Sequence, residues 1–218
     1  MVKGIIFDLD GLMFDTEPVW IAAWDVAFQE QGLSFRRELL PQFFGASHEA
    51  IGKIVGKAYA GDERALAAVH EHARIGREMM LEKGAAKKPG LDELLAFAKD
   101  QDIRCAVASA SPKELISAHL DHGGIEGYFS AIAAGDDGLP SKPAPDVFLE
   151  AARRLGTEPA ATAVLEDSAL GIDAASAGGF IPVMVPDMVE PTEETRDKAR
   201  FVCRSLHEVQ ELLAEGRL

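Results

Sequence analysis

The stretch that decides the fold reads Val2-Lys3-Gly4-Ile5-Ile6-Phe7-Asp8-Leu9-Asp10-Gly11. Its apolar run, Val2–Phe7, is typical of a buried parallel strand. Asp8 and Asp10 follow where that strand ends, and ligands bind at the carboxyl ends of strands in open α/β sheets. Two carboxylates so close repel each other, so they need a cation or a shared proton. Asp-x-Asp also occurs in turns and on solvated surfaces, so the rest of the chain must decide between these interpretations.

Strands and helices alternate beyond residue 88, which predicts an α/β fold with a parallel sheet covered by helices on both faces. The expected strands cover residues 103–108, 131–134, 161–165, 181–185 and 201–203, and the expected helices cover 91–101, 112–122, 146–156 and 168–177.

Residues 15–86 have helical spacing and no convincing strand, with two short helices broken at Phe44–Ser47. Trp20 and Trp24 are expected in the core of this segment. It interrupts the α/β pattern, which predicts an inserted all-helical cap domain. We therefore expect an α/β core of residues 1–14 and 88–218 and a cap of residues 15–87.

Composition narrows the range of possible partners and locations. The 218 residues include 22 Lys and Arg against 36 Asp and Glu, a net charge of −14, which argues against nucleic acid and anionic membranes as partners. No apolar run approaches the ~20 residues of a membrane span, and no signal segment precedes the first strand. Cys105 and Cys203 are far apart in the sequence, and Cys105, in an apolar run, is expected as a buried thiol rather than half of a disulfide. These features predict a cytoplasmic protein, and we expect a monomer.

Three further polar clusters join the two aspartates. Ser109-Ala110-Ser111 and Glu166-Asp167 follow expected strands, and Lys142 precedes an expected helix. If the strands are neighbours, all four clusters share one rim. That rim could hold Mg²⁺, which prefers oxygen ligands and bridges carboxylates to phosphoryl oxygens. One carboxylate could then act as nucleophile and another as acid and base. Each cluster also has a plain alternative: Lys142 as a surface lysine, Ser109 as a helix cap, and Glu166-Asp167 as acids favouring a helix N-terminus.

These clusters resemble, in order, the four motifs of the haloacid dehalogenase superfamily. The neighbouring sequences Gly11-Leu12-Met13-Phe14-Asp15-Thr16-Glu17 and Lys142-Pro143-Ala144-Pro145-Asp146 are similar to its phosphatase branch with a helical cap. The resemblance implies a Rossmann-like core, Mg²⁺ as cofactor and a phosphoaspartate intermediate.

The resemblance also implies roles for individual residues. Asp8 would be the nucleophile and Asp10 the acid and base, while Ser109, Ala110 and Lys142 would bind the phosphate. The implied metal ligands are Asp8, Asp10 (through its backbone carbonyl), Glu166 and Asp167. The reaction expected is Mg²⁺-dependent hydrolysis of a small phosphomonoester, such as a sugar phosphate, with a small phosphorylated metabolite as partner.

Three other functions share parts of this pattern. A phosphosugar mutase is the first, since the chain is similar to the β-phosphoglucomutase family throughout. That family has a cap histidine where this chain has Trp20 and a cap arginine where it has His48, and both departures favour a phosphatase. Asp10 argues against a dehalogenase, which does not need it. A phospho-accepting signalling domain has no use for a helical insertion of about 70 residues.

The six histidines show no metal-ligand spacing, and most are expected on solvated helix surfaces. His48 is the exception, because it follows a break between helices and could contact substrate as a specificity residue. Lys87-Lys88 is expected to be a solvated hinge.

Overall fold

The computed structural model describes residues 2–43 and 46–218. The chain divides into two compact units, one of residues 1–15 and 85–218 and one of residues 16–84. Part of the predicted break at Phe44–Ser47, namely Phe44 and Gly45, lies outside the described residues. Across the described ranges, no helix is long and apolar enough to cross a membrane.

The larger unit is built on a six-stranded sheet in the order β5-β4-β1-β6-β7-β8, with every neighbouring pair parallel. The first strand of the chain lies inside the sheet, where Ile5 pairs with Cys105 on one side and Ala163 on the other. The strands are β1 (Gly4–Phe7), β4 (Arg104–Ala108), β5 (Phe129–Ala133), β6 (Thr162–Glu166), β7 (Ile181–Met184) and β8 (Phe201–Val202). This order confirms the α/β fold class expected from the sequence.

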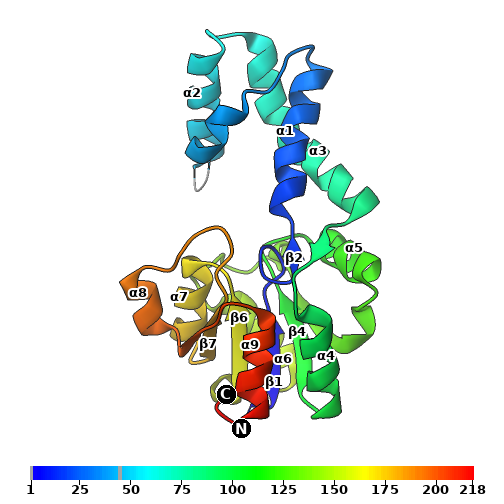
Figure 1. Cartoon of the computed structure of the whole chain (residues 1–218), viewed down its shortest axis with the longest axis vertical. Coiled ribbons are helices and arrows are strands. Elements are labelled where there is room, and N and C mark those ends of the chain that lie inside the picture. The colour runs from blue at the N-terminus through cyan, green and yellow to red at the C-terminus, as the bar shows by residue number, and fades with distance from the viewer. Residues whose placement is uncertain (1, 44–45) are drawn as a thin grey trace. The chain divides into compact units, whose positions relative to one another are not determined.

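Successive residues of β1 point to opposite sides of the sheet. Because these residues are apolar, both faces are buried under helices. Ile5 and Phe7 belong to one apolar core and Ile6 to another. The first core packs under α4 (Leu91–Asp100), α5 (Lys113–Gly123) and α9 (Leu206–Ala214), and Figure 1 shows α4 and α9 in front of the strands. The second packs under α6 (Asp146–Leu155) and α7 (Ala169–Ala177). Single turns of 3₁₀ helix span Glu126–Tyr128, Gly135–Asp137 and Pro159–Ala161.

Two short strands mark the limits of the larger unit. β2 (Phe14–Asp15) and β3 (Ala86–Lys87) pair antiparallel. The pairing places Asp15 and residues 85–87 with the larger unit, whereas the sequence prediction had put them in the helical segment.

The smaller unit is helical, with α1 (Glu17–Glu30), a 3₁₀ helix (Arg37–Gln42), α2 (His48–Ala58) and α3 (Glu63–Lys83). The ends of α3 follow from its sequence: the Asp62 side chain accepts a hydrogen bond from the Arg64 backbone N–H (2.9 Å), and Gly84 ends the helix at φ 67°. Trp24 is buried in the apolar core of this unit, as expected, whereas Trp20 is only half-buried.

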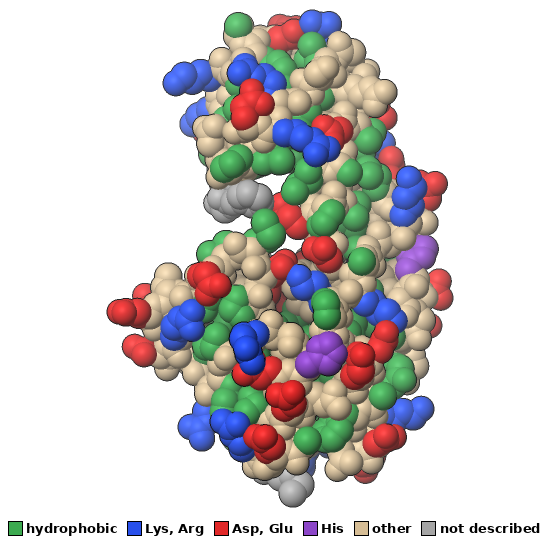
Figure 2. Space-filling model, viewed as in Figure 1, with side chains coloured by type: hydrophobic (Ala, Val, Ile, Leu, Met, Phe, Trp, Pro, Cys, Tyr) green, Lys and Arg blue, Asp and Glu red, His purple; other side chains and the backbone are tan. Residues whose placement is uncertain are grey.

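Several expectations were incomplete or wrong. Neither α8 (Glu193–Lys198) nor α9 was predicted, although Leu206, Val209 and Leu212 of α9 repeat at helical spacing. His119 is fully buried rather than solvated, because it lies on the same face of α5 as Leu115 and Ile116. Cys105 is free and buried, as expected, and Cys203 is free and buried as well. On the visible surface, acidic and basic side chains are intermixed (Figure 2).

Candidate active site

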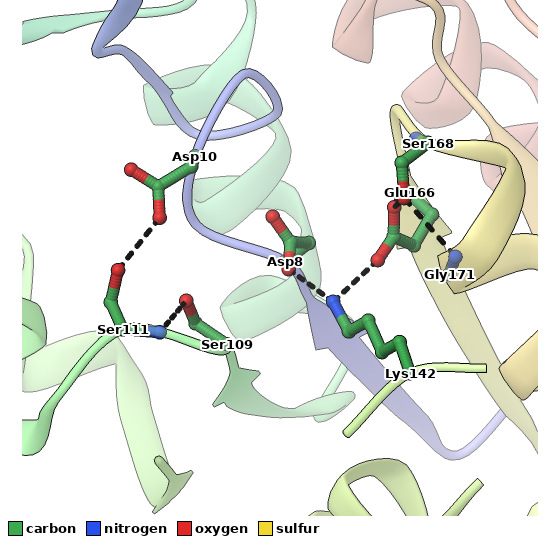
Figure 3. Close-up of polar contacts among 8 residues, drawn as sticks. All are labelled: Asp8, Asp10, Ser109, Ser111, Lys142, Glu166, Ser168 and Gly171. Atoms are coloured by element: carbon green, nitrogen blue, oxygen red, sulfur yellow. Dashed lines mark hydrogen bonds and ion pairs between the residues drawn. The ribbon is translucent and has the colours of Figure 1, made fainter. Parts of the chain in front are cut away.

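Polar side chains gather at the carboxyl edge of the central strands. Asp8 follows β1, Ser109 follows β4, and Glu166 ends β6. Because β4, β1 and β6 are adjacent and parallel, their carboxyl ends lie at one edge of the sheet, where Figure 3 shows these side chains together. Loop residue Lys142 reaches the same place. The structure therefore brings residues of all four predicted polar clusters into one site.

Lys142 holds two carboxylates together. Its Nζ lies 2.5 Å from Asp8 Oδ1 and 2.5 Å from Glu166 Oε1 (Figure 3), and it lies 4.8 Å from the centre of the Phe148 ring. Burial disfavours the ammonium charge, but the two carboxylates outweigh burial and raise the pKa of Lys142. Lys142 is therefore a charged lysine with only 13% of its side chain exposed, which argues against the alternative of a surface residue.

Asp8 is buried, with 6% of its surface exposed. Its backbone N–H donates to the Leu165 carbonyl oxygen at 3.0 Å, which fixes the residue beside the end of β6. Burial raises the pKa of Asp8 well above its ordinary value, Lys142 opposes that rise, and neighbouring carboxylates add to it, with Glu166 first among them. A cation at this site would favour the ionised form.

Glu166 is fully buried and fixed from two sides. Oε1 contacts Lys142, while Oε2 accepts hydrogen bonds from the Ser168 backbone N–H (3.0 Å) and hydroxyl (2.8 Å). Ser168 in turn caps α7 by accepting from the Gly171 N–H at 3.1 Å. A Cβ atom at Gly171 would overlap the Glu166 carboxyl group, so glycine is needed there for space. The network holds Glu166 as a rigid partner for Lys142.

Asp10 has a hydroxyl partner that the sequence analysis did not single out. Ser111 Oγ donates to Asp10 Oδ2 at 2.8 Å (Figure 3), and the Ser111 backbone N–H donates to Ser109 Oγ at 3.0 Å. The hydroxyl pair after β4 was visible in the sequence, but nothing there assigned its second member to Asp10. The contact orients the Asp10 carboxyl group without removing its second oxygen from use.

Asp167 follows Glu166 and is half-buried. Burial, and then the charge of Glu166, raise the pKa of Asp167 to about 7. Gly11 packs against it at φ 79°, and a Cβ atom there would clash with Asp167 Oδ2. The proposed metal-binding carboxylate thus faces a stretch of bare backbone.

The donor set fits Mg²⁺. No group of three His, Cys, Asp or Glu side chains is arranged to hold a metal within residues 2–43 and 46–218. Mg²⁺ ordinarily takes one or two carboxylates together with waters and substrate oxygens. Asp8 and Asp167 supply that number. Burial first, and neighbouring carboxylates after it, raise the pKa values of both groups, and a divalent cation would favour their ionised forms.

A small pocket of about 70 Å³ opens beside these groups. Its lining includes Ser109, Ala110 and Lys142, the three residues predicted to bind phosphate, together with Gly135. The volume is far below the roughly 300–1,000 Å³ of sites for drug-sized ligands. It suits a compact anionic group rather than a whole substrate.

Comparison with known proteins identifies the family. The family model described as haloacid dehalogenase-like hydrolase matches residues 5–185. The chain belongs to this family. A relative, fructose-1-phosphate phosphatase YqaB of Escherichia coli (strain K12), is 32% identical over 84% of this chain and 95% of its own. Hexitol phosphatase B of the same organism is 29% identical over 100% of this chain and 97% of its own.

A solved structure shows the same fold. A Thermotoga maritima protein provisionally assigned as a β-phosphoglucomutase matches this haloacid dehalogenase-like hydrolase with a TM-score of 0.80 and 26% identity, over 98% of this chain and 99% of that one. The match confirms the sequence-based expectations for both family and fold.

His48 lies in the helical unit and is described there by itself. It is exposed at the start of α2, with Nε2 3.3 Å from His70 Nδ1. It also lines a cavity of about 250 Å³ with Trp20, Trp24 and His72 among its walls. Trp24 stacks on His72 with ring centroids 3.6 Å apart. A role for His48 in specificity stays a prediction.

Proposed function

We propose that this haloacid dehalogenase-like hydrolase cleaves a small phosphomonoester, of the sugar phosphate class, with Mg²⁺ as cofactor and through a phosphoaspartate on Asp8. The observation that carries the proposal is the Lys142 bridge between Asp8 and Glu166 at the carboxyl edge of the sheet, with Asp10 beside it. The names of the two bacterial relatives, phosphatases of fructose 1-phosphate and hexitol phosphate, support the substrate class. We further propose that the helical unit, residues 16–84, acts as its cap domain.

Asp8 is proposed as the nucleophile because it is fixed, buried and held by a charged lysine. One carboxylate oxygen of Asp8 forms a bond to phosphorus, and the bond from phosphorus to the leaving oxygen breaks. Lys142, Ser109 and the Ala110 backbone bind the phosphoryl oxygens. Asp8, Asp167 and the Asp10 carbonyl would hold Mg²⁺, with Glu166 as their neighbour, and the ion would offset phosphoryl charge.

Asp10 is proposed as the proton donor and acceptor. It gives a proton to the leaving oxygen in the first step, so that the alcohol departs neutral. In the second step it takes a proton from water as the water oxygen bonds to phosphorus. The bond between phosphorus and Asp8 then breaks, which releases inorganic phosphate and restores both carboxyl groups. The Ser111 hydroxyl orients Asp10 in both steps.

A phosphosugar mutase is the second candidate, favoured by the structural match. Trp20 argues against it. This residue stands where the mutase resemblance implies a histidine, and its ring packs so closely on α3 that only glycine fits at position 76. A mutase would convert a sugar 1-phosphate to the 6-phosphate without releasing inorganic phosphate, so the two reactions separate in one assay.

The decisive experiment compares Asp8→Asn with Asp173→Asn. This control changes a carboxylate on α7 that pairs with Lys198 of α8. We expect Asp8→Asn to abolish phosphate release from hexose and hexitol phosphates while circular dichroism stays unchanged. The control should keep wild-type turnover. EDTA should stop the wild-type enzyme and Mg²⁺ should restore it. Turnover by purified Asp8→Asn would contradict the nucleophile, and full activity in EDTA would contradict the cofactor.

A further inference from the structure

Lys88 makes an ion pair that bridges distant parts of the larger unit. Its backbone N–H donates to the Met13 carbonyl oxygen at 2.8 Å, beside the β2–β3 pairing. Its Nζ lies 2.6 Å from Asp187 Oδ1, in the loop that follows β7. Only 24% of the Lys88 side chain and 14% of the Asp187 side chain are exposed. The expected solvated hinge lysine is therefore a half-buried partner of a carboxylate.

Asp187 lies next to the proposed metal-binding carboxylate. A Cβ atom at Gly11 would clash with Asp167 Oδ2 and would also lie 3.3 Å from Asp187 Oδ2, so both carboxyl groups face the same point of the Gly11 backbone. The negative charge of Asp187 contributes to the raised pKa of Asp167, after burial and Glu166. At such short range and partial burial, the charge of each group acts on the other with little screening.

We propose that the Lys88–Asp187 ion pair sets the affinity of the Asp8–Asp167 site for divalent cations. Lys88 neutralises Asp187 and holds its carboxylate away from the ion, so that two carboxylates of this cluster bind metal rather than three. Lys88 and Asp187 are thus positioning residues. The inference rests on the proposed function, because it assumes that Asp8 and Asp167 bind the cation.

The two halves of the pair should move affinity in opposite directions. Lys88→Met leaves Asp187 as an added negative charge beside the site, so divalent cations should bind about fivefold more tightly. Asp187→Asn leaves the Lys88 charge unopposed, so binding should weaken about fivefold. The double variant should return close to the wild-type value. A pair with only a structural role would weaken binding in both single variants.

The probe is Mn²⁺ alone, measured by electron paramagnetic resonance on the full chain without substrate. Lys87→Met is the matched control, because this adjacent lysine pairs with Asp92 at 2.7 Å. The affinity of this variant for Mn²⁺ should equal that of the wild-type protein. Thermal unfolding checks that each variant is folded.

The outcomes separate the two levels of the proposal. Opposite shifts in the two single variants support the ion-pair inference. Two results overturn the inference: Mn²⁺ affinity that weakens equally in Lys88→Met and Asp187→Asn, or affinity that changes in neither. If the wild-type protein binds Mn²⁺ and Asp167→Asn abolishes that binding, the proposed metal site still stands. A wild-type protein that binds no Mn²⁺ overturns both.

Discussion

Replacing Lys142 with methionine removes one charge from the centre of the site and keeps nearly the same side-chain volume. In the wild-type protein the ammonium contacts two buried carboxylates, Asp8 and Glu166, at 2.5 Å each. Breaking a buried ion pair from one side costs about 3–5 kcal/mol, because the remaining charge stays buried without a partner. Since whole domains are stable by only about 5–15 kcal/mol, we expect a large fall in the free energy of unfolding.

The assay is urea unfolding at pH 7 in EDTA, with Lys198→Met as control. Lys198 also contacts two carboxylates, Asp173 and Glu194, at 2.8 Å each, but at the surface, so its removal should leave the midpoint almost unchanged. The loss in Lys142→Met should shrink at pH 5, because the raised pKa of Asp8 lets that carboxyl take up a proton and lose its buried charge. Equal midpoints for the two variants would refute the assignment of Lys142 as a buried ion-pair partner.

Two further substitutions test packing in the larger unit. His119 is fully buried, stacks on Phe14, and has no hydrogen-bond partner for either ring nitrogen among the residues that the structure describes. Burial lowers its pKa below 6.5, so the folded state takes up its proton only at lower pH than the unfolded chain does, and stability falls as the pH drops below 6.5. His119→Leu should gain about 1 kcal/mol at pH 7 and more at pH 5, measured by urea unfolding; a gain that does not grow in acid would count against this account. Gly171→Ala should lower the free energy of unfolding by about 1–3 kcal/mol and remove most of the activity, since its Cβ would push Glu166 from its ion pair. The control is Gly52→Ala, at a helical glycine with open space around it, which should not destabilise the protein. Tolerance of alanine at both positions would show that the crowding at Glu166 is absent.

The carboxyl edge of the sheet was predictable because it depends on short-range patterns. Apolar runs that end in Asp8, Ser109 and Glu166 predicted buried parallel strands, and parallel neighbours bring their ends together by geometry alone. Lys142 was expected at the same rim because its cluster lies between the others in the chain, but its loop has no periodicity that fixes where its side chain points.

The contacts between loops were not predictable. Asp10 and Ser111 are 101 residues apart in the chain, and Lys88 and Asp187 are 99 apart. Each contact depends on the path of a loop after it leaves the sheet. Tertiary packing determines that path, and no local sequence pattern predicts it. His119 is different, because its spacing from the apolar residues of α5 already placed it on the buried face. Its polarity, rather than its position, led to the wrong expectation.

The charge balance of the site argues for a cation independently of any relative. Asp8, Glu166 and Asp167 face one ammonium, Lys142, and the charges of neighbouring carboxylates add to burial in raising the pKa values of Asp8 and Asp167. A phosphate monoester brings nearly two more negative charges, in a chain whose own net charge is −14. Protonating the carboxylates would admit the anion but would remove the proposed nucleophile, Asp8. A divalent cation resolves both demands, because it attracts the phosphoryl oxygens and keeps Asp8 ionised. The same balance explains why Asp187 has its own lysine: an unpaired carboxylate there would compete with the substrate for that cation.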